Sequence, residues 1–358
     1  MKIGILTYHR VYNYGATLQA VAMRIFLENR GLHVSYVDYY PEYHKKMYRA
    51  FNLSGFWKKN LYEKMYCLYD NFRQFRSRKE RMKVYDTFLS KYILPYCSND
   101  AEEHYDVMIY GSDQIWRKQP GLDFQYNPVY FGSNDFVCDR RVSYAASMGN
   151  TNINEEDASF IKEHLSNFSA VGVRERDLYD VLKPYKLRNL SMNADPTLLL
   201  DKGDWDNALH TERLIKEPYA LFYKVRDSFS DDVLKKYCSA KRLKLVKVNP
   251  CNAPLGSDCN PNPAEFVSLI KYADVVLTSS FHGLAFSIVY QKEVFVSSRS
   301  NTARMSSLMQ SIGVEGRLLP FGSPIPIDAS PIDYVKVKNK LAEVKRESEE
   351  FLQNTLEN

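Results

Sequence analysis

A histidine that follows an apolar run is the residue in this chain whose type and position best suit chemistry. His282 lies in Ser279-Ser280-Phe281-His282-Gly283, between a strand-like run at 275–278 and a helix-like run at 283–290. Such a junction leaves backbone N–H groups and the positive end of a helix free to bind phosphate or carboxylate. An imidazole there can hold or donate a proton at neutral pH. The motif predicts a site for an anionic substrate, and a capped helix with a buried histidine is the alternative.

Two groups of polar residues that follow expected strands suit a sugar acceptor. The first follows the strand at 2–8 and supplies amides together with a glycine, which lets a ligand approach the backbone closely. The second follows the strand at 106–110 and combines a carboxylate, an amide and an indole, groups that bond sugar hydroxyls and stack on sugar rings. The acceptor-binding residues expected from these groups are Asn13, Gly15, Gln19, Ser112, Asp113, Gln114 and Trp116. An ordinary turn and a helix cap beside a buried tryptophan are the alternatives.

Basic residues near the other expected strand ends suit an anionic donor. Arg174 ends the strand at 170–173, and its planar guanidinium can hold a carboxylate or phosphate through two parallel bonds. Further cations follow His282 in the sequence and could add charge to the same pocket. The donor-binding residues expected are Arg174, Ser279, Ser280, His282, Gly283, Lys292, Arg299 and Arg304. Surface pairing of Arg174 with a nearby acid is the alternative.

The elements that must position these residues follow an alternating pattern. Strand-like apolar runs alternate with amphipathic helix-like runs, which is typical of parallel sheets covered by helices on both faces. We expect an N-terminal α/β domain at 1–200 on the acceptor side and a C-terminal α/β domain at 215–325 on the donor side, with the polar stretch 201–216 as the crossing. A charged helix at 334–356, within the last segment 326–358, is expected to pack back on the first domain. The fold class is therefore two Rossmann-like α/β domains whose strand ends face a central cleft.

Composition limits the class of protein. With 358 residues, 45% hydrophobic and 25% charged, the chain suits two soluble globular domains. The first apolar run is too short for a signal peptide or a membrane span, so we expect a cytoplasmic location. The six cysteines include no CxxC pair and no histidine at zinc-ligand spacing, so free thiols are expected, with neither a disulfide framework nor a metal.

A basic, aromatic insertion is expected at 43–92. Between Lys45 and Lys83 there are twelve Lys or Arg against three acids, interleaved with nine aromatic residues. This composition suits peripheral contact with an anionic membrane face or a phosphate-bearing partner, and a solvated helical face is the alternative. Nucleic acid is not an expected partner, because no nucleic-acid motif accompanies the charge.

Six short motifs, which occur in the same order over residues 1–325, resemble the polysaccharide pyruvyltransferase family. They are Asn13-Tyr14-Gly15-Ala16-Thr17-Leu18-Gln19, Gly111-Ser112-Asp113-Gln114-Ile115-Trp116, Tyr144-Ala145-Ala146-Ser147-Met148-Gly149, Val173-Arg174-Glu175, Asp195-Pro196-Thr197-Leu198-Leu199-Leu200 and Ser279-Ser280-Phe281-His282-Gly283. The resemblance implies a GT-B-like fold, phosphoenolpyruvate as donor substrate and a sugar as acceptor, with no cofactor. The product it implies is a pyruvate ketal on a capsule, exopolysaccharide or other surface polysaccharide.

The same resemblance implies that Arg174 and His282 handle the donor. Many members carry an arginine at the position of Ser280, so Arg304, Arg299 or Lys292 would have to supply that charge. His282 is the expected acid or base, and Asp113 is our candidate for orienting the acceptor, which the basic insertion could recruit in a lipid-diphosphate-linked form. Two alternatives stay open, namely a nucleotide-sugar glycosyltransferase of the same architecture and a non-catalytic carbohydrate-binding protein.

Overall fold

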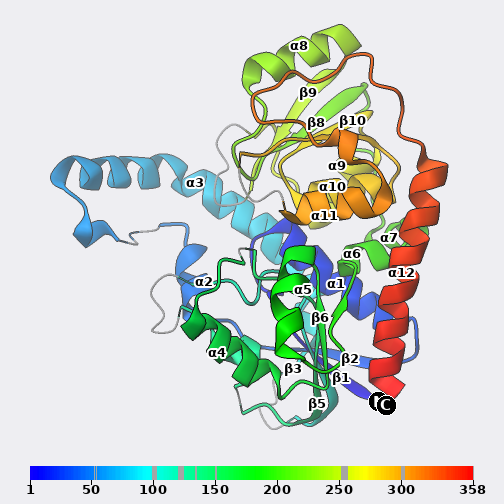
Figure 1. Cartoon of the computed structure of the whole chain (residues 1–358). Helices are drawn as coiled ribbons and strands as arrows, with labels where there is room; N and C mark the ends of the chain where they lie inside the picture. The colour runs from blue at the N-terminus through cyan, green and yellow to red at the C-terminus, as the bar shows by residue number, and fades with distance from the viewer. Residues whose placement is uncertain are drawn as a thin grey trace.

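The computed structural model describes residues 1–51, 53, 55–98, 103–119, 125–133, 135–149, 151–250, 257–299 and 303–357. Within these ranges the chain forms two parallel sheets, one above the other in Figure 1. The first sheet contains β1 (Lys2–Leu6), β2 (His33–Val37), β3 (Cys97–Ser98), β4 (Tyr105–Tyr110), β5 (Cys138–Ala146), β6 (Ala170–Val173) and β7 (Ser191–Met192). The second sheet contains β8 (Tyr219–Tyr223), β9 (Lys244–Val248), β10 (Val275–Thr278) and β11 (Glu293–Val296).

Helices connect the strands and cover the sheets. Those that belong to the first sheet or its insertion are α1 (Tyr14–Glu28), α2 (Glu42–Met47), α3 (Leu61–Tyr92), α4 (Glu155–Leu165) and α5 (Arg176–Leu182). The remaining helices are α6 (Pro196–Leu199), α7 (Lys202–Leu209), α8 (Asp231–Lys241), α9 (Pro263–Lys271), α10 (Phe281–Val289), α11 (Ala303–Ile312) and α12 (Tyr334–Glu357). Short 3-10 turns are η1 (Phe56–Lys58), η2 (Leu94–Tyr96), η3 (Pro128–Phe131), η4 (Lys183–Tyr185) and η5 (Glu315–Arg317).

Strand order explains where a site can form. The first sheet runs β3-β2-β1-β4-β5-β6-β7 and the second runs β11-β10-β8-β9, with parallel pairing throughout. The order therefore reverses between β1 and β4 in one sheet and between β8 and β10 in the other. Loops leave such neighbouring strands in opposite directions and open a crevice beyond their carboxyl ends. The loops after these four strands are the ones that should meet a ligand.

The two sheets pack against each other through α1. Its tyrosine Tyr14 stacks on Phe266 of α9, with ring centroids 4.3 Å apart, and donates a hydrogen bond to the carbonyl of Pro261. Arg81 of α3 is fully buried beside it. Its guanidinium is compensated there by hydrogen bonds that it donates to the Tyr14 hydroxyl and to the carbonyl of Pro250. One apolar cluster consequently runs from the first sheet into the second.

Helix α12 spans both halves of the molecule (Figure 1). Near its start, the Tyr334 hydroxyl donates to the carbonyl of Lys292, which directly precedes β11. At its end, Arg140 of β5 donates to the carbonyls of Thr355 and Leu356, at 2.9 and 3.1 Å. The last helix of the chain is thus pinned to each sheet in turn.

The expected fold class is confirmed, since two Rossmann-like parallel sheets present their strand ends to each other in a GT-B-like arrangement. The crossing between the sheets contains a helix that was not expected, and one residue of the basic insertion lies in the interior. The stretch 201–216 contains α7, because Asp201 and Asp204 form a capping box and Trp205 is buried on the core side. Arg81 also does not belong to an exposed basic face, since it is buried at the interface described above.

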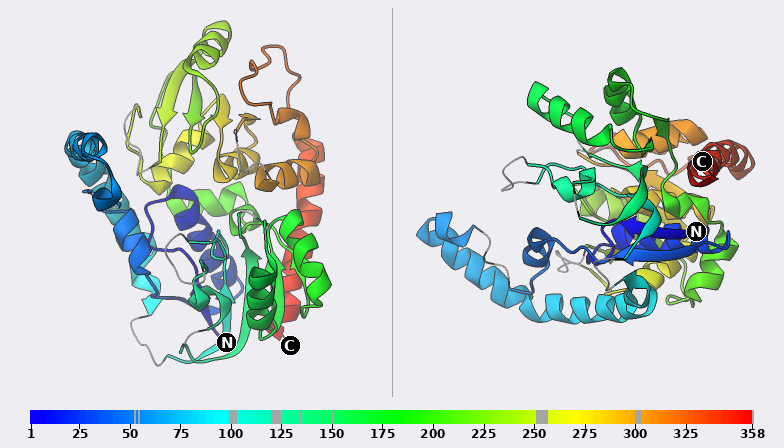
Figure 2. Two further views of the ribbon diagram at one scale, coloured as in Figure 1. Left: turned by 60° about the vertical axis from the view of Figure 1, so that its left-hand side comes forward. Right: turned by 90° about the horizontal axis from the view of Figure 1, so that it is seen from below.

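Helix α3 leaves the body of the molecule as a long arm, visible in every view of Figures 1 and 2. It has 32 residues and begins with a capping box between Asn60 and Glu63. Among the described helices none combines the length and apolar character that a membrane span needs. Five described cysteines are free thiols, and Cys251 lies outside the described residues.

Candidate active site

A cavity of about 250 Å³ lies where the carboxyl ends of the two sheets meet. The loops after β1 and β4 line one wall, and the loops after β8 and β10 line the other. The volume is near the lower end of the range of small-molecule sites. Among the residues expected from the sequence, the lining includes Asn13, Asp113, Gln114, Ser279, Ser280, His282 and Arg304. Members of the expected acceptor and donor groups therefore open onto one space.

Hydrogen bonds from small hydroxyl residues shape the start of α10. The Ser280 side chain caps the helix by accepting from the Gly283 N–H at 3.3 Å, and its own N–H donates to the Thr278 hydroxyl at 3.0 Å. Gly283 has no room for a side chain, because a Cβ there would lie 2.5 Å from the Thr278 hydroxyl oxygen. The hydroxyl of Ser279 holds the adjoining loop by accepting from the N–H groups of Val225 and Arg226. These bonds fix the first turn of α10 at the cavity wall.

The imidazole of His282 reaches across to the first sheet. A Cβ on Gly15 would lie 1.9 Å from its Nδ1, so the ring rests directly on the backbone at the start of α1. Its Nε2 lies 3.5 Å from a carboxylate oxygen of Asp195. Gly15 is buried, and its function in this structure is to admit the imidazole.

Asp195 is the carboxylate shared by the two residues expected to handle the donor. The guanidinium of Arg174 donates to it at 2.5 Å, and Thr197 donates to its other oxygen through both hydroxyl and N–H. Burial would raise the pKa of Asp195, but His282 and Arg174 lower it well below its usual range. The carboxylate is therefore ionised and fully engaged within the protein.

This arrangement corrects the expected position of Arg174. We expected Arg174 and His282 to bind the donor together, but both contact Asp195, and Arg174 does not line the cavity. Burial acts to lower the pKa of the Arg174 guanidinium, and the carboxylates of Asp195 and Glu175 outweigh it and raise the pKa. Arg174 is a buried cation behind the cavity wall, where it orients Asp195.

Arg304 supplies a cation at the cavity itself. It lies at the start of α11, and its nearest carboxylate is Glu175, at 3.9 Å. Burial, followed by repulsion from Arg174, lowers its pKa to about 10, which still leaves it charged at neutral pH. Burial raises the pKa of Glu175, which also accepts a hydrogen bond from Ser147.

The opposite wall carries groups that suit hydroxyls. Asn13 caps α1 by accepting from the Ala16 N–H at 3.2 Å while remaining exposed toward the cavity. Asp113 has a φ of 65°, in the left-handed region, and this backbone turn brings Asp113 and Gln114 to the lining. A carboxylate and two amides therefore face the histidine from the other domain.

Three expected acceptor residues are structural instead. Gln19 is fully buried, and its amide donates to Thr7 and Ala16 while accepting from the Ser112 N–H. Ser112 is fully buried and donates to Asp195 at 3.3 Å. Trp116 is also fully buried; its indole donates to the Tyr130 carbonyl and stacks on Phe131, so it offers no face to a sugar.

Two expected donor residues lie away from the cavity. Lys292 directly precedes β11, whose first residue pairs with Val275, so it lies at the amino end of the sheet and His282 at the carboxyl end. Arg299 is exposed and lies over the ring of Phe321, 5.6 Å from its centroid. Of the three cations proposed to replace the arginine absent at Ser280, only Arg304 lines the cavity.

Four cavity or near-cavity residues were missed from the sequence. Asp195 precedes Pro196, a pattern of helix capping, and it does cap α6 as well as binding Arg174. His44, Arg117 and Arg226 line the cavity but come from segments with no motif of their own. Burial lowers the pKa of His44 to about 4, so it is neutral at pH 7. Only the position of Arg226 just after β8 could have indicated the site.

Two clusters of side chains that could bind a metal lie away from the cavity. Among the described residues, His9, Asp38 and Cys97 form one cluster and His104, Asp106 and Asp139 form another. Both oxygens of Asp38 already accept from Arg10, at 2.7 Å. None of these side chains lines the cavity, so they assign no metal to the candidate site.

Solved structures resemble this fold only distantly. A functionally uncharacterized protein from Klebsiella pneumoniae aligns with a TM-score of 0.47 and 12% identity, over 90% of this chain and 93% of that one. A UDP-GlcNAc 2-epimerase from Neisseria meningitidis has a TM-score of 0.45 and 11% identity, over the full length of both chains. The calicheamicin glycosyltransferase CalG4 has a TM-score of 0.40 and 12% identity, over 98% of this chain and 94% of that one. Likenesses at this level indicate no activity.

Sequence comparison is more specific. No curated protein matches the chain. The model of the family named polysaccharide pyruvyl transferase matches residues 13–301 of the 358, a range that begins at Asn13, the cap of α1, and includes Asp195 and the whole His282 turn. Most residues that line the cavity, His282, Asp113 and Asn13 among them, lie within the match, whereas Arg304 lies just beyond it. Because the match spans well over half of the sequence, the chain belongs to the polysaccharide pyruvyl transferase family.

Proposed function

We propose that this protein transfers the pyruvyl group of phosphoenolpyruvate onto two hydroxyls of one sugar, forming a pyruvate ketal during capsule or exopolysaccharide biosynthesis. One observation carries the proposal: a single cavity joins His282, the first turn of α10 and Arg304 to Asp113 and Asn13 on the facing wall. An anionic donor and a hydroxyl-bearing acceptor thus meet complementary groups. Family membership supports the transfer of a pyruvyl group to a polysaccharide.

The donor carries a carboxylate and a phosphate next to one enol carbon. The free N–H groups of α10 and the Arg304 guanidinium suit these anionic groups, because charge-assisted hydrogen bonds in a partly dry site are strong. Arg304 takes the place of the arginine absent at Ser280. The buried Arg174 acts indirectly by holding Asp195 beside His282.

The chemistry balances with the groups present. A proton reaches the methylene carbon of phosphoenolpyruvate and makes a methyl group, while a sugar hydroxyl attacks the neighbouring carbon and loses its proton. A second hydroxyl of the same sugar then displaces phosphate, and its proton leaves with the phosphate. His282 would transfer these protons and Asp113 would orient the acceptor.

Acceptor-dependent phosphate release from phosphoenolpyruvate tests the proposal, with the ketal methyl group identified by NMR of the product. His282→Ala should lower the rate by about 10²- to 10⁴-fold, the usual contribution of a positioned acid or base. His33→Ala is the matched control, because His33 is exposed at the start of β2, far from the lining residues. Turnover of a nucleotide sugar without phosphoenolpyruvate would point to a glycosyltransferase, and binding of sugars without any turnover would point to a carbohydrate-binding protein.

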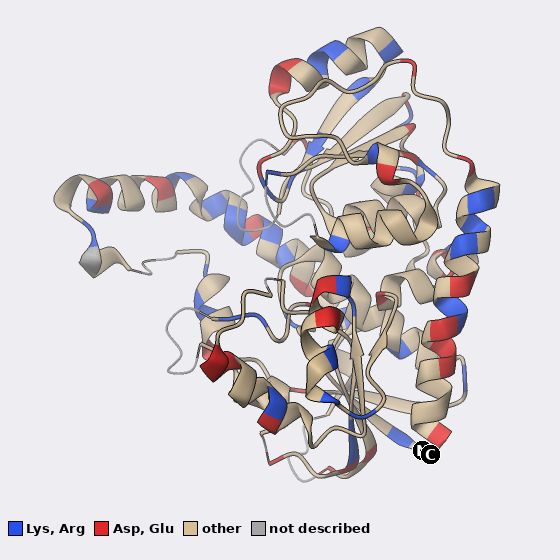
Figure 3. Cartoon of the chain, in the orientation of Figure 1, with Lys and Arg blue, Asp and Glu red and all other residues tan. Residues whose placement is uncertain are grey.

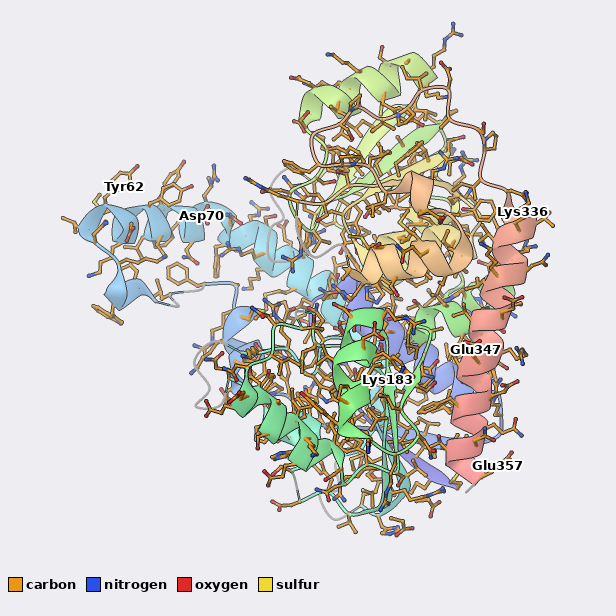
Figure 4. All side chains as sticks on the ribbon, viewed as in Figure 1. Tyr62, Asp70, Lys183, Lys336, Glu347 and Glu357 are labelled. Atoms are coloured by element: carbon orange, nitrogen blue, oxygen red, sulfur yellow. The ribbon has the colours of Figure 1, made fainter. Side chains whose placement is uncertain are left out.

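The α3 arm suits peripheral contact with an anionic membrane, where a lipid-diphosphate-linked acceptor would be found. Tyr62 points outward near the end of the arm in Figure 4, and Trp57 beside it is 86% exposed. The outer face of α3 is apolar near the tip and basic toward the body, where blue segments gather in Figure 3. The exposed residues between Leu61 and Lys83 are Leu61, Tyr62, Glu63, Met65, Tyr66, Tyr69, Phe72, Arg73, Phe75, Arg76, Lys79, Glu80 and Lys83. Interfacial aromatics beside cations match a lipid headgroup surface, and the repulsion between like charges opposes pairing with a second copy.

Sedimentation with vesicles tests this contact. The protein should bind vesicles that contain phosphatidylglycerol and not vesicles of phosphatidylcholine alone, and Arg76→Gln with Lys79→Gln should weaken binding about tenfold or more. A matched control changes Lys236 and Lys241 of α8, which are exposed outside the arm. Equal binding by both double variants would refute the membrane contact. A doubled mass in light scattering that the triple change of Tyr62, Tyr66 and Tyr69 to Ser abolishes would assign the arm to self-association.

A further inference from the structure

Two arginines from opposite sheets line the cavity without a place in the donor pocket described above. Arg117 follows β4 by way of the Asp113 turn, and its N–H donates to the Gln114 carbonyl. Arg226 follows β8, and its N–H donates to the Ser279 hydroxyl. Each arginine therefore follows a strand at one of the two positions where strand order reverses. A backbone hydrogen bond fixes each residue beside one wall of the donor pocket.

The two arginines line one cavity from opposite sheets and carry like charges. Burial, and then the positive charge of Arg117, lower the pKa of Arg226. Within the described part of the chain, neither guanidinium has a carboxylate in ion-pair distance, whereas Arg174 pairs with Asp195 and Arg304 with Glu175. Asp227, next to Arg226 in sequence, lies 3.9 Å from Lys224 instead.

Arg117 is exposed and Arg226 is half-buried, so solvent weakens the repulsion between them, and a bound anion would remove it. Arginine also presents its donors in a fork that fits two oxygens of a phosphate. The acidic side chain that lines the cavity close to Arg117 is Asp113, and it lies on the wall that faces His282. The pair is thus better matched to a second phosphoryl group than to the sugar itself.

We propose that Arg117 and Arg226 form a phosphoryl-binding site for the diphosphate that carries the acceptor sugar, separate from the donor pocket at His282 and Arg304. This inference rests on the proposed function, and it adds the residues that would bind the diphosphate of the acceptor. A sugar joined to a diphosphate would place its hydroxyls toward Asp113 while the phosphoryl oxygens bridge the two sheets. Free sugars without a phosphoryl group would then be poor acceptors.

Calorimetry with inorganic pyrophosphate as the probe tests the site in two stages. Phosphoenolpyruvate is first titrated into the wild-type protein, and failure of that step alone would count against the proposed function. Pyrophosphate is then titrated into protein saturated with phosphoenolpyruvate. We expect binding in this ternary mixture, at least tenfold weaker binding of pyrophosphate to the double variant Arg117→Gln, Arg226→Gln, and unchanged affinity for phosphoenolpyruvate.

Arg188→Gln is the control, because Arg188 is exposed on the first domain and does not line the cavity. It should bind both probes as the wild type does. Competition between pyrophosphate and phosphoenolpyruvate would overturn the inference and assign the arginine pair to the donor. Equal pyrophosphate affinity in the double variant and the wild type would also overturn it.

Discussion

Replacement of Gly15 by alanine would test whether the position of the His282 ring decides activity. The added methyl carbon would lie 1.9 Å from Nδ1 and 2.4 Å from the neighbouring ring carbons, whereas ordinary contact begins near 3.4 Å. The clash cannot be relieved by the α1 backbone, which packs on α9 and α10. The imidazole must therefore move by about 1.5 Å, and its 3.5 Å contact with Asp195 would be lost.

A misplacement of about 1 Å at a reacting group costs on the order of 10²-fold in rate, so Gly15→Ala should lose at least about 100-fold in kcat/KM, or about 2.7 kcal/mol of transition-state stabilisation. The fold should survive, because alanine is a better helix former than glycine. Steady-state phosphate release measures the rate and circular dichroism the melting temperature. Gly316→Ala is the control, since a Cβ there meets nothing within 4 Å. Activity of Gly15→Ala within threefold of the wild type, with normal melting, would refute the geometric argument.

Three further substitutions concern buried polar or charged side chains. The pKa of His44 is lowered to about 4, so between pH 7 and pH 5 the unfolded state takes up a proton near pH 6.5 and the folded state does not; the wild type should therefore lose about 2 kcal/mol of stability over this range. His44→Gln should lack this loss when urea unfolding is measured at the two pH values, and equal losses in both proteins would contradict the assignment. Asp195→Asn leaves Arg174 buried without its 2.5 Å partner and should cost about 3–5 kcal/mol in urea unfolding; a cost below about 1 kcal/mol would mean that Arg174 finds another counter-charge. Arg81→Met removes two buried hydrogen bonds and should cost about 2 kcal/mol or more by the same assay, against less than about 0.5 kcal/mol for the exposed Arg76→Met; similar costs for both would argue against the buried tie to Pro250.

Much of the fold could be predicted from the sequence because its signals are local. Apolar runs such as 170–173 and 275–278 are strands with the expected bounds, since four consecutive buried residues suit a strand covered on both faces. The helix α7 was not predicted, because most of its residues are polar and only Trp205 and Leu209 are buried. Its existence depends on tertiary packing around that tryptophan.

The candidate site was predictable where residues follow directly after a strand, as His282 and Asp113 do. The prediction failed where a polar side chain forms its hydrogen bonds with other groups of the protein. Gln19 has the chemistry to bind a sugar, but its amide joins α1 to the β4 turn. Lys292 follows His282 closely in sequence, yet α10 carries the chain to the other end of the sheet. The position of Arg226 just after β8 was the one signal for it, but the sequence could not indicate that Arg117, which belongs to the other sheet, lines the same cavity.

The attachment of α12 to both sheets has a mechanical consequence. A 24-residue helix is a stiff rod about 36 Å long, and this one is fastened by hydrogen bonds near each end. Sliding one sheet past the other would break those fastenings, whereas a small rotation about the rod would not. Relative motion of the halves would therefore pivot at this edge and have its greatest amplitude on the opposite edge, from which α3 projects (Figure 1). In the proposed reaction, a bulky acceptor would find its widest approach there.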